Sequence, residues 1–114
     1  MVSYTDPYAE FSDDGMFSPT DLVVNNKYFR IANSFISRFR WVFQRLSKES
    51  QRSEFVRVHQ YHYRVAHRLV DLILSQSSAN ESQLDLLYVE LYHHGKTLNI
   101  DDRISWLRRY DPLA

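Results

Sequence analysis

The feature that most constrains the fold is the spacing of apolar residues between positions 18 and 48. Pairs of apolar residues recur there every seven positions, and the pairs are Tyr28 with Phe29, Phe35 with Ile36, and Val42 with Phe43. At about 100° per residue, all three pairs lie on one side of a helix. We therefore expect one long amphipathic helix from Ser18 to Lys48.

N-terminal signals mark the expected start of this helix. Ser18 is a preferred N-cap residue, Pro19 suits the first helical position, and Asp21 follows in the first turn. Phe17 and Leu22 are spaced as a hydrophobic staple across the cap. These signals predict that the helix begins at Ser18.

The polar side of the same helix is basic. It carries Lys27, Arg30, Arg38 and Arg45, and no acidic residue occurs between Asp21 and Glu49. Trp41 lies in the middle of this side, with Arg38 one turn before it and Arg45 one turn after it. Tryptophan and arginine are enriched at binding hot spots and form cation–π contacts. Trp41 is therefore either covered by another part of the chain or exposed to a partner.

A second long helix is expected from Ser53 to Gln76, after a polar connection. Its apolar residues alternate at spacings of three and four, the pattern of a seam between packed helices. The residues expected in the shared core are Phe35, Phe39, Leu46, Val58, Val65 and Leu69.

The outer face of the second helix also combines arginine with an aromatic ring. It carries Arg57, Tyr61, Arg64 and Arg68, which either form a solvated face or extend a binding surface. We predict that partners bind through this face and through Lys27, Arg30, Arg38, Trp41 and Arg45. The sequence leaves open whether the two faces are neighbours or point apart.

Two shorter helices are expected at the C-terminal end. Asn80 and Gln83 have the spacing of a capping box, and Gly95 is expected to end the third helix as a left-handed residue. The last helix is expected to begin at Asn99 to Asp102 and to end near Tyr110. The third helix is apolar on nearly every side, which predicts a subunit interface formed by Leu86, Val89 and Tyr92.

Residues 1–17 are expected to form an irregular acidic and aromatic arm, and residues 18–114 a single helical domain. The first 21 residues carry five acids and no base, whereas residues 22–70 carry ten bases and two acids, a net charge of +8. Opposite charge favours docking of the arm on the basic face around Trp41, and a free tail is the alternative. The predicted fold is all-α, an antiparallel bundle of four helices, two long and two short.

The residue content argues against catalysis and against a bound cofactor. The chain has no cysteine, no glycine-rich phosphate loop and no Gly-x-Ser-x-Gly motif. His59 with His62, and Glu90 with His93, are spaced as ligands on helices, but a di-iron bundle needs two Glu-x-x-His pairs and two further glutamates. We therefore expect no catalytic residue, no metal site and no cofactor. His62 is expected to be a neutral, hydrogen-bonded residue in a polar notch of the core.

The expected function is that of a small non-catalytic adaptor or regulatory protein. The chain shows neither a secretory signal nor a membrane-spanning segment, so we expect a soluble, cytoplasmic protein without membrane contact. It is expected to bind another protein, and to form a homodimer. The alternative is nucleic-acid binding, with Arg and Lys on phosphates and Trp41 or Tyr61 stacked on bases. A helix-turn-helix over residues 84–110 fits poorly, because Asp101 and Asp102 would repel phosphates.

Overall fold

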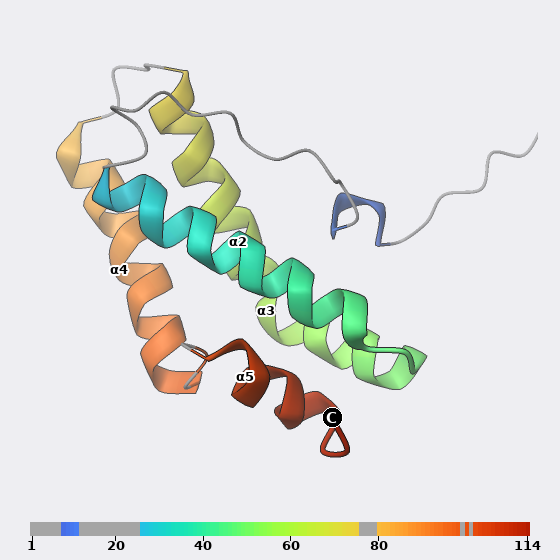
Figure 1. Cartoon of the computed structure of the whole chain (residues 1–114). Coiled ribbons are helices and arrows are strands. Elements are labelled where there is room, and N and C mark those ends of the chain that lie inside the picture. Colours follow the sequence, from blue (N-terminus) through green and yellow to red (C-terminus); the bar gives the residue numbers. More distant parts are fainter. Residues whose placement is uncertain (1–7, 12–25, 76–79, 99, 101) are drawn as a thin grey trace, which may run out of the picture.

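The computed structural model describes residues 8–11, 26–75, 80–98, 100 and 102–114. A short 3-10 helix, η1 (Ala9–Phe11), precedes four α-helices in this part of the chain. They are α2 (Lys27–Arg45), α3 (Glu49–Leu74), α4 (Glu81–Leu98) and α5 (Arg103–Tyr110). The predicted all-α bundle is therefore confirmed (Figure 1).

The centre of the bundle is the pair α2 and α3, which lie side by side over their length (Figure 1). Only residues 46–48 join them, so the chain reverses direction abruptly and α3 returns along α2. Helix α4 packs on both of them, and α5 packs mainly on α2. An antiparallel order of all four helices stays a prediction.

The first helix is shorter than expected at both ends. Asn26 is extended, with φ −75° and ψ 127°, and its side chain accepts hydrogen bonds from the backbone N–H groups of Tyr28 and Phe29. Because Asn26 is not helical, the expected uninterrupted helix from Ser18 to Lys48 is wrong. Ser18 itself lies outside the described residues. At the other end the extended backbone of Leu46 stops α2.

The boundaries of α3 and α4 also differ from expectation. Helix α3 begins at Glu49 and not at Ser53, because Glu49 suits the positive end of the helix dipole and the polar run after it is compatible with a first turn. Helix α4 continues through Gly95 to Leu98, where the Arg109 side chain donates a hydrogen bond to the Leu98 carbonyl. Gly95 therefore does not end the helix.

The last helix begins as predicted. The Asp102 carboxylate accepts hydrogen bonds from the Ile104 N–H at 3.0 Å and from the Ser105 hydroxyl at 3.2 Å. Arg108 and Arg109 follow in the last turn, where they complement the helix dipole.

Aromatic rings fill the core between α2 and α3. Phe39 is fully buried, and its ring centroid lies 4.4 Å from that of Tyr63 and 4.7 Å from that of Phe55. The predicted core residues that are buried are Phe35, Phe39, Leu46, Val65 and Leu69. Val58 is only half-buried, because it lies about 100° around α3 from the buried His59 and so at the edge of the core.

One imidazole lies inside this core. His59 on α3 is 1% exposed, and it contacts His94 of α4 together with Trp106 and Tyr110 of α5. Burial lowers the pKa of His59 to about 3 and that of His94 to about 4, so both are neutral near pH 7.

His62 is hydrogen-bonded as the sequence predicts, but it lies at the edge of the bundle and not in a notch of the core. Its Nε2 lies 3.3 Å from the Glu90 carboxylate at the edge of the bundle, and its ring stacks on His94 at 3.6 Å. The neutral core histidine bonded to a tyrosine hydroxyl is His59, three residues earlier on α3.

None of the described helices has the length and apolar content needed to cross a bilayer.

Candidate functional site

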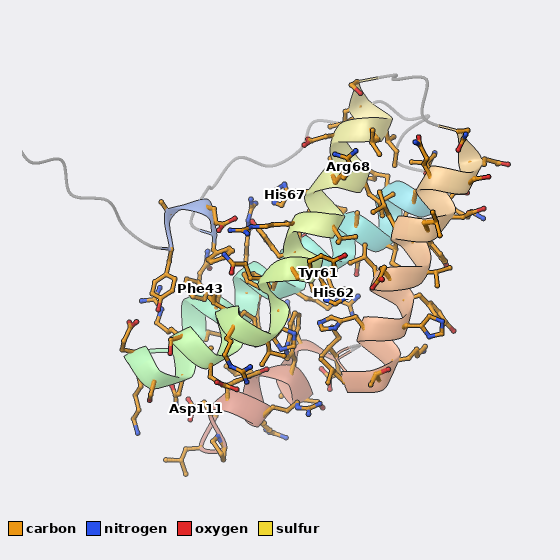
Figure 2. All side chains as sticks on the ribbon, turned by 180° about the vertical axis from the view of Figure 1, so that it is seen from behind. Phe43, Tyr61, His62, His67, Arg68 and Asp111 are labelled. Atoms are coloured by element: carbon orange, nitrogen blue, oxygen red, sulfur yellow. The ribbon has the colours of Figure 1, made fainter. Side chains whose placement is uncertain are left out.

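The residues predicted to bind partners lie on two separate faces. The rings of Phe39 and Tyr63 meet between α2 and α3, with centroids 4.4 Å apart. Trp41 follows Phe39 by two residues, and Tyr61 precedes Tyr63 by two, so each lies about 200° around its helix from the contact. Trp41 and Tyr61 therefore point away from each other. Figure 2 shows Tyr61 and Arg68 on α3 in front, with α2 behind it. The nine residues therefore do not form one surface.

The face of α3 is partly neutralised within the chain. Arg57 donates two hydrogen bonds to Glu54, at 3.0 and 2.5 Å, and Arg64 forms an ion pair with Glu10 at 3.1 Å. Tyr61 is 62% exposed and makes an edge contact with the ring of His62. Arg68 is exposed. This face offers less positive charge to a partner than its arginine content suggests.

Trp41 is half-buried between two arginines. The guanidinium carbon of Arg45 lies 3.8 Å from the Trp41 ring centroid, and that of Arg103 lies 4.7 Å away. Arg103 belongs to α5, so another part of the same chain covers Trp41 in part, and the rest of the ring is exposed. In these cation–π contacts both guanidinium groups already interact with the Trp41 ring, so less of their positive charge is available to a partner.

The described part of the arm docks on a different side of the bundle. Phe11 is fully buried against Phe39, Phe43 and Tyr63 and makes no contact with Trp41. The expectation that the arm covers the face around Trp41 is therefore wrong for residues 8–11. Apolar contact in the core outweighs attraction to an exposed basic face, because ion pairs at the surface contribute only about 0 to 1 kcal/mol each. Residues 1–7 and 12–17 lie outside the described part.

A groove runs between α2 and α4. It consists of two hollows, of about 180 and about 420 Å³, that share Ile31 and Arg38. Basic and aromatic side chains line it, namely Lys27, Arg30, Arg38 and Lys96 with Phe35, Tyr88 and Tyr92. Of the predicted partner-binding residues, the groove brings together Lys27, Arg30 and Arg38. We call this surface the α2–α4 groove.

Helical spacing places these side chains on two facing strips. Lys27, Arg30 and Arg38 follow one side of α2, while Tyr88, Tyr92 and Lys96 recur every four residues on α4. The rings of Tyr88 and Tyr92 stack with centroids 6.3 Å apart.

Lysine ammonium groups lie at both ends of this stack. The Lys27 Nζ atom is 5.7 Å from the Tyr88 centroid, and the Lys96 Nζ atom is 5.6 Å from the Tyr92 centroid. The groove thus has a strip of cations on α2 beside a pair of stacked rings on α4, a combination that suits acidic and aromatic segments.

The groove is held in place by hydrogen bonds at its walls. The Tyr28 hydroxyl donates to Asp85 at 2.5 Å, which ties α2 to α4, and this bond raises the pKa of Tyr28 to about 12. Arg38 donates to the Ile100 carbonyl at 3.1 Å and to the Ser34 hydroxyl at 2.8 Å. These two hydrogen bonds hold the Arg38 side chain in the wall of the groove, where its guanidinium adds positive charge.

An exposed apolar stripe on α4 adjoins the groove. Leu86 is 71% exposed, and Val89 and Tyr92 are each 47% exposed. These are the residues predicted to form a subunit interface. Leu91 is the buried residue of α4, so this helix packs by one face and is not enclosed on all sides.

Sequence reasoning missed the aromatic wall of the groove. It assigned Tyr92 to the subunit interface, although the spacing of Tyr88, Tyr92 and Lys96 places all three on one side of a helix. The position of α4 beside Lys27 and Arg30 was needed to show what that side faces.

The histidines do not assemble a metal site in the part of the chain described here. No group of three or more His, Asp or Glu side chains among those residues is arranged to hold a metal ion.

Comparison of the chain with models of protein families, with curated protein sequences and with solved structures finds no match. Function is therefore inferred from the surface itself.

Proposed function

We propose that this is a small non-catalytic adaptor or regulatory protein of the cytoplasm that binds an acidic segment of another protein in the α2–α4 groove. The observation that carries the proposal is a strip of cations on α2 that faces the stacked rings of Tyr88 and Tyr92 on α4 across one groove. Charge steers an acidic segment to such a surface, and burial of rings and apolar side chains holds it.

A protein partner accounts for more of this surface than a nucleic acid does. Ile31 lines both hollows of the groove and offers apolar contact that a phosphate backbone cannot use. A mixed surface with an apolar centre is typical of protein interfaces.

Nucleic-acid binding is the second candidate, and one observation favours it. The stacked rings of Tyr88 and Tyr92, with a lysine at each end, resemble the stacking platforms that hold single-stranded bases. On this alternative, Lys27, Arg30 and Lys96 would contact phosphates. Binding would then weaken steeply with salt.

We also propose that the protein forms a two-fold dimer through Leu86, Val89 and Tyr92. A two-fold axis brings the same stripe from each copy together, so one apolar stripe is enough for a self-complementary contact. Tyr92 lies both in this stripe and at the groove, so dimerisation would place two grooves close together.

Affinity capture from the native cell extract tests the proposed function. Wild-type protein, Arg30→Glu and Arg68→Glu are used as baits, each with and without nuclease. Arg68 is the matched control, because it is an exposed arginine on the outer face of α3. We expect a protein that wild type and Arg68→Glu retain and that Arg30→Glu loses at least tenfold, unaffected by nuclease. Equal loss with both variants would reject the groove, and nuclease-sensitive capture would support the second candidate.

A further inference from the structure

The described part of the arm fills a cleft between α2 and α3, on a side of the bundle away from the α2–α4 groove. Phe11 is the anchor, because it is fully buried. Its ring centroid lies 5.0 Å from Phe39, 5.5 Å from Phe43 and 5.1 Å from Tyr63. A phenylalanine buried to this extent contributes more than any other contact of the arm, at about 25 cal/mol per Å² of apolar surface.

Tyr8 occupies a second position at the rim of the cleft. Its ring lies 5.2 Å from that of Phe43, and the Arg52 guanidinium lies 5.2 Å from its centroid. Its hydroxyl donates a hydrogen bond to Glu49 at 2.5 Å. The position thus accepts an aromatic ring with a polar tip.

Glu10 occupies a third position, which is polar. Its carboxylate accepts hydrogen bonds from Arg64 at 3.1 Å and from Gln60 at 3.1 Å, and these contacts outweigh its desolvation and lower its pKa. The Tyr63 hydroxyl donates to the Glu10 carbonyl at 3.2 Å and accepts from Arg40 at 3.1 Å. The cleft therefore holds a backbone carbonyl as well as side chains.

These three positions define a recognition pattern, which is aromatic, any residue, acid, aromatic. The two aromatic positions use side chains of both α2 and α3, whereas the Glu10 position uses Gln60, Tyr63 and Arg64 of α3. We propose that this cleft is a peptide-binding site for an aromatic and acidic segment of another protein, and that the chain's own Tyr8–Phe11 occupies it as an intramolecular competitor. This site is independent of the α2–α4 groove.

Covalent connection decides when a partner can enter the cleft. The arm belongs to the same chain as the cleft, so it binds there intramolecularly, at an effective concentration of about millimolar. A segment with the same contacts is therefore excluded at micromolar concentration. A partner enters when it binds more tightly than the arm or when the arm is weakened.

Direct binding of a labelled peptide to the full-length protein tests the proposal. The probe is a fluorescent peptide with the sequence of residues 4–15, and its anisotropy is measured against wild type, Phe11→Ala and Glu10→Lys. Both substitutions weaken the arm and leave the cleft intact. We expect the peptide to bind each variant at least tenfold more tightly than wild type.

Two controls show that the peptide occupies this cleft. In Glu10→Lys/Arg64→Glu, the reversed pair restores the arm's ion pair and repels the peptide's glutamate, so binding should return to the weak level of wild type. A peptide in which alanine replaces Phe11 should not bind either variant. Circular dichroism melts show whether each variant folds, and Glu10→Lys keeps the experiment valid if Phe11→Ala unfolds.

Three results would overturn the proposal. The first is no binding to a folded Glu10→Lys variant, and the second is equal binding of the alanine peptide. The third is a wild-type dimer that Phe11→Ala abolishes, since this would assign the cleft to the arm of a second copy.

Discussion

The indole Nε1–H of Trp106 donates a hydrogen bond of 3.0 Å to Nε2 of His59 in the core. An indole can only donate, so His59 Nε2 carries no proton and the ring hydrogen is on Nδ1. The Nδ1–H then donates to Nε2 of His94 at 3.0 Å, and the Tyr110 hydroxyl, 2.5 Å from His59 Nε2, also donates. One neutral tautomer of His59 thus joins α3, α4 and α5.

Acid should loosen this junction. Folding lowers the pKa of His59 from 6.5 to about 3 and that of His94 to about 4, so below pH 6.5 the unfolded chain binds protons that the folded chain does not. The free energy of unfolding should therefore fall as pH decreases from about 6.5 towards 4, by about 1.4 kcal/mol per pH unit for each histidine that stays neutral. Urea denaturation at a series of pH values measures this slope.

Two variants assign the slope to the buried pair. His93→Gln removes an exposed histidine of α4 that lies outside the His59 network, and it is the reference for the loss of one histidine. His94→Gln should reduce the slope, because it removes one of the two depressed pKa values and keeps a hydrogen-bond acceptor for His59. A wild-type stability that is flat between pH 6.5 and 4 would contradict the neutral network.

Phe39 should be among the most costly residues to truncate. It is fully buried and its ring lies between those of Phe11, Phe55 and Tyr63. Phe39→Ala should lower the free energy of unfolding by about 3 to 5 kcal/mol, because it removes apolar burial and leaves a cavity. Tyr61→Ala, at a residue that is 62% exposed, should change it by only about 0.5 kcal/mol. Chemical denaturation compares the two, and a Phe39→Ala variant as stable as Tyr61→Ala would show that the core is placed wrongly.

The sequence predicts those parts of this fold that depend on neighbours along the chain. Helical spacing predicts the buried stripe of α2. The Asp102 cap is predictable because its side chain bonds to a backbone N–H group only two residues away. The sequence predicts that Gly95 ends α4. A glycine inside a helix costs only about 1 kcal/mol relative to alanine, and packing at the end of α4 outweighs this cost. Local signals are reliable where no tertiary contact opposes them.

The parts that sequence reasoning missed depend on contacts between distant segments. His59 and His62 both lie on the inner half of α3, and only the positions of Trp106 and Tyr110 decide which of them is enclosed. The arm was expected at Trp41 because charge and rings matched there. The pit between Phe39, Phe43 and Tyr63 exists only once α2 and α3 have packed, so composition could not reveal it.

The environment of Trp41 gives a third prediction. Arg103 of α5 lies over its ring, whereas Phe11 does not contact it. Arg103→Ala should therefore increase quenching of Trp41 fluorescence by acrylamide and shift its emission to the red. Phe11→Ala should leave both unchanged. Trp106 is fully buried and contributes equally to each sample.

The opposite pattern would contradict this account of Trp41. A red shift with Phe11→Ala and none with Arg103→Ala would mean that the arm, and not α5, covers the indole.

The last prediction concerns self-association through α4. Val89 is 47% exposed beside Leu86, which is 71% exposed, and a two-fold axis would bury both residues twice. Val89→Glu places two carboxylates in that contact, where removal of each charge from water is costly, so it should convert the dimer to a monomer. Gln44→Glu adds the same charge to an exposed position on α2, outside the stripe, and it should leave the dimer intact. Light scattering at micromolar concentration measures the mass of wild type and both variants. A monomeric wild type, or a dimer that survives Val89→Glu, would show that the exposed stripe serves another purpose.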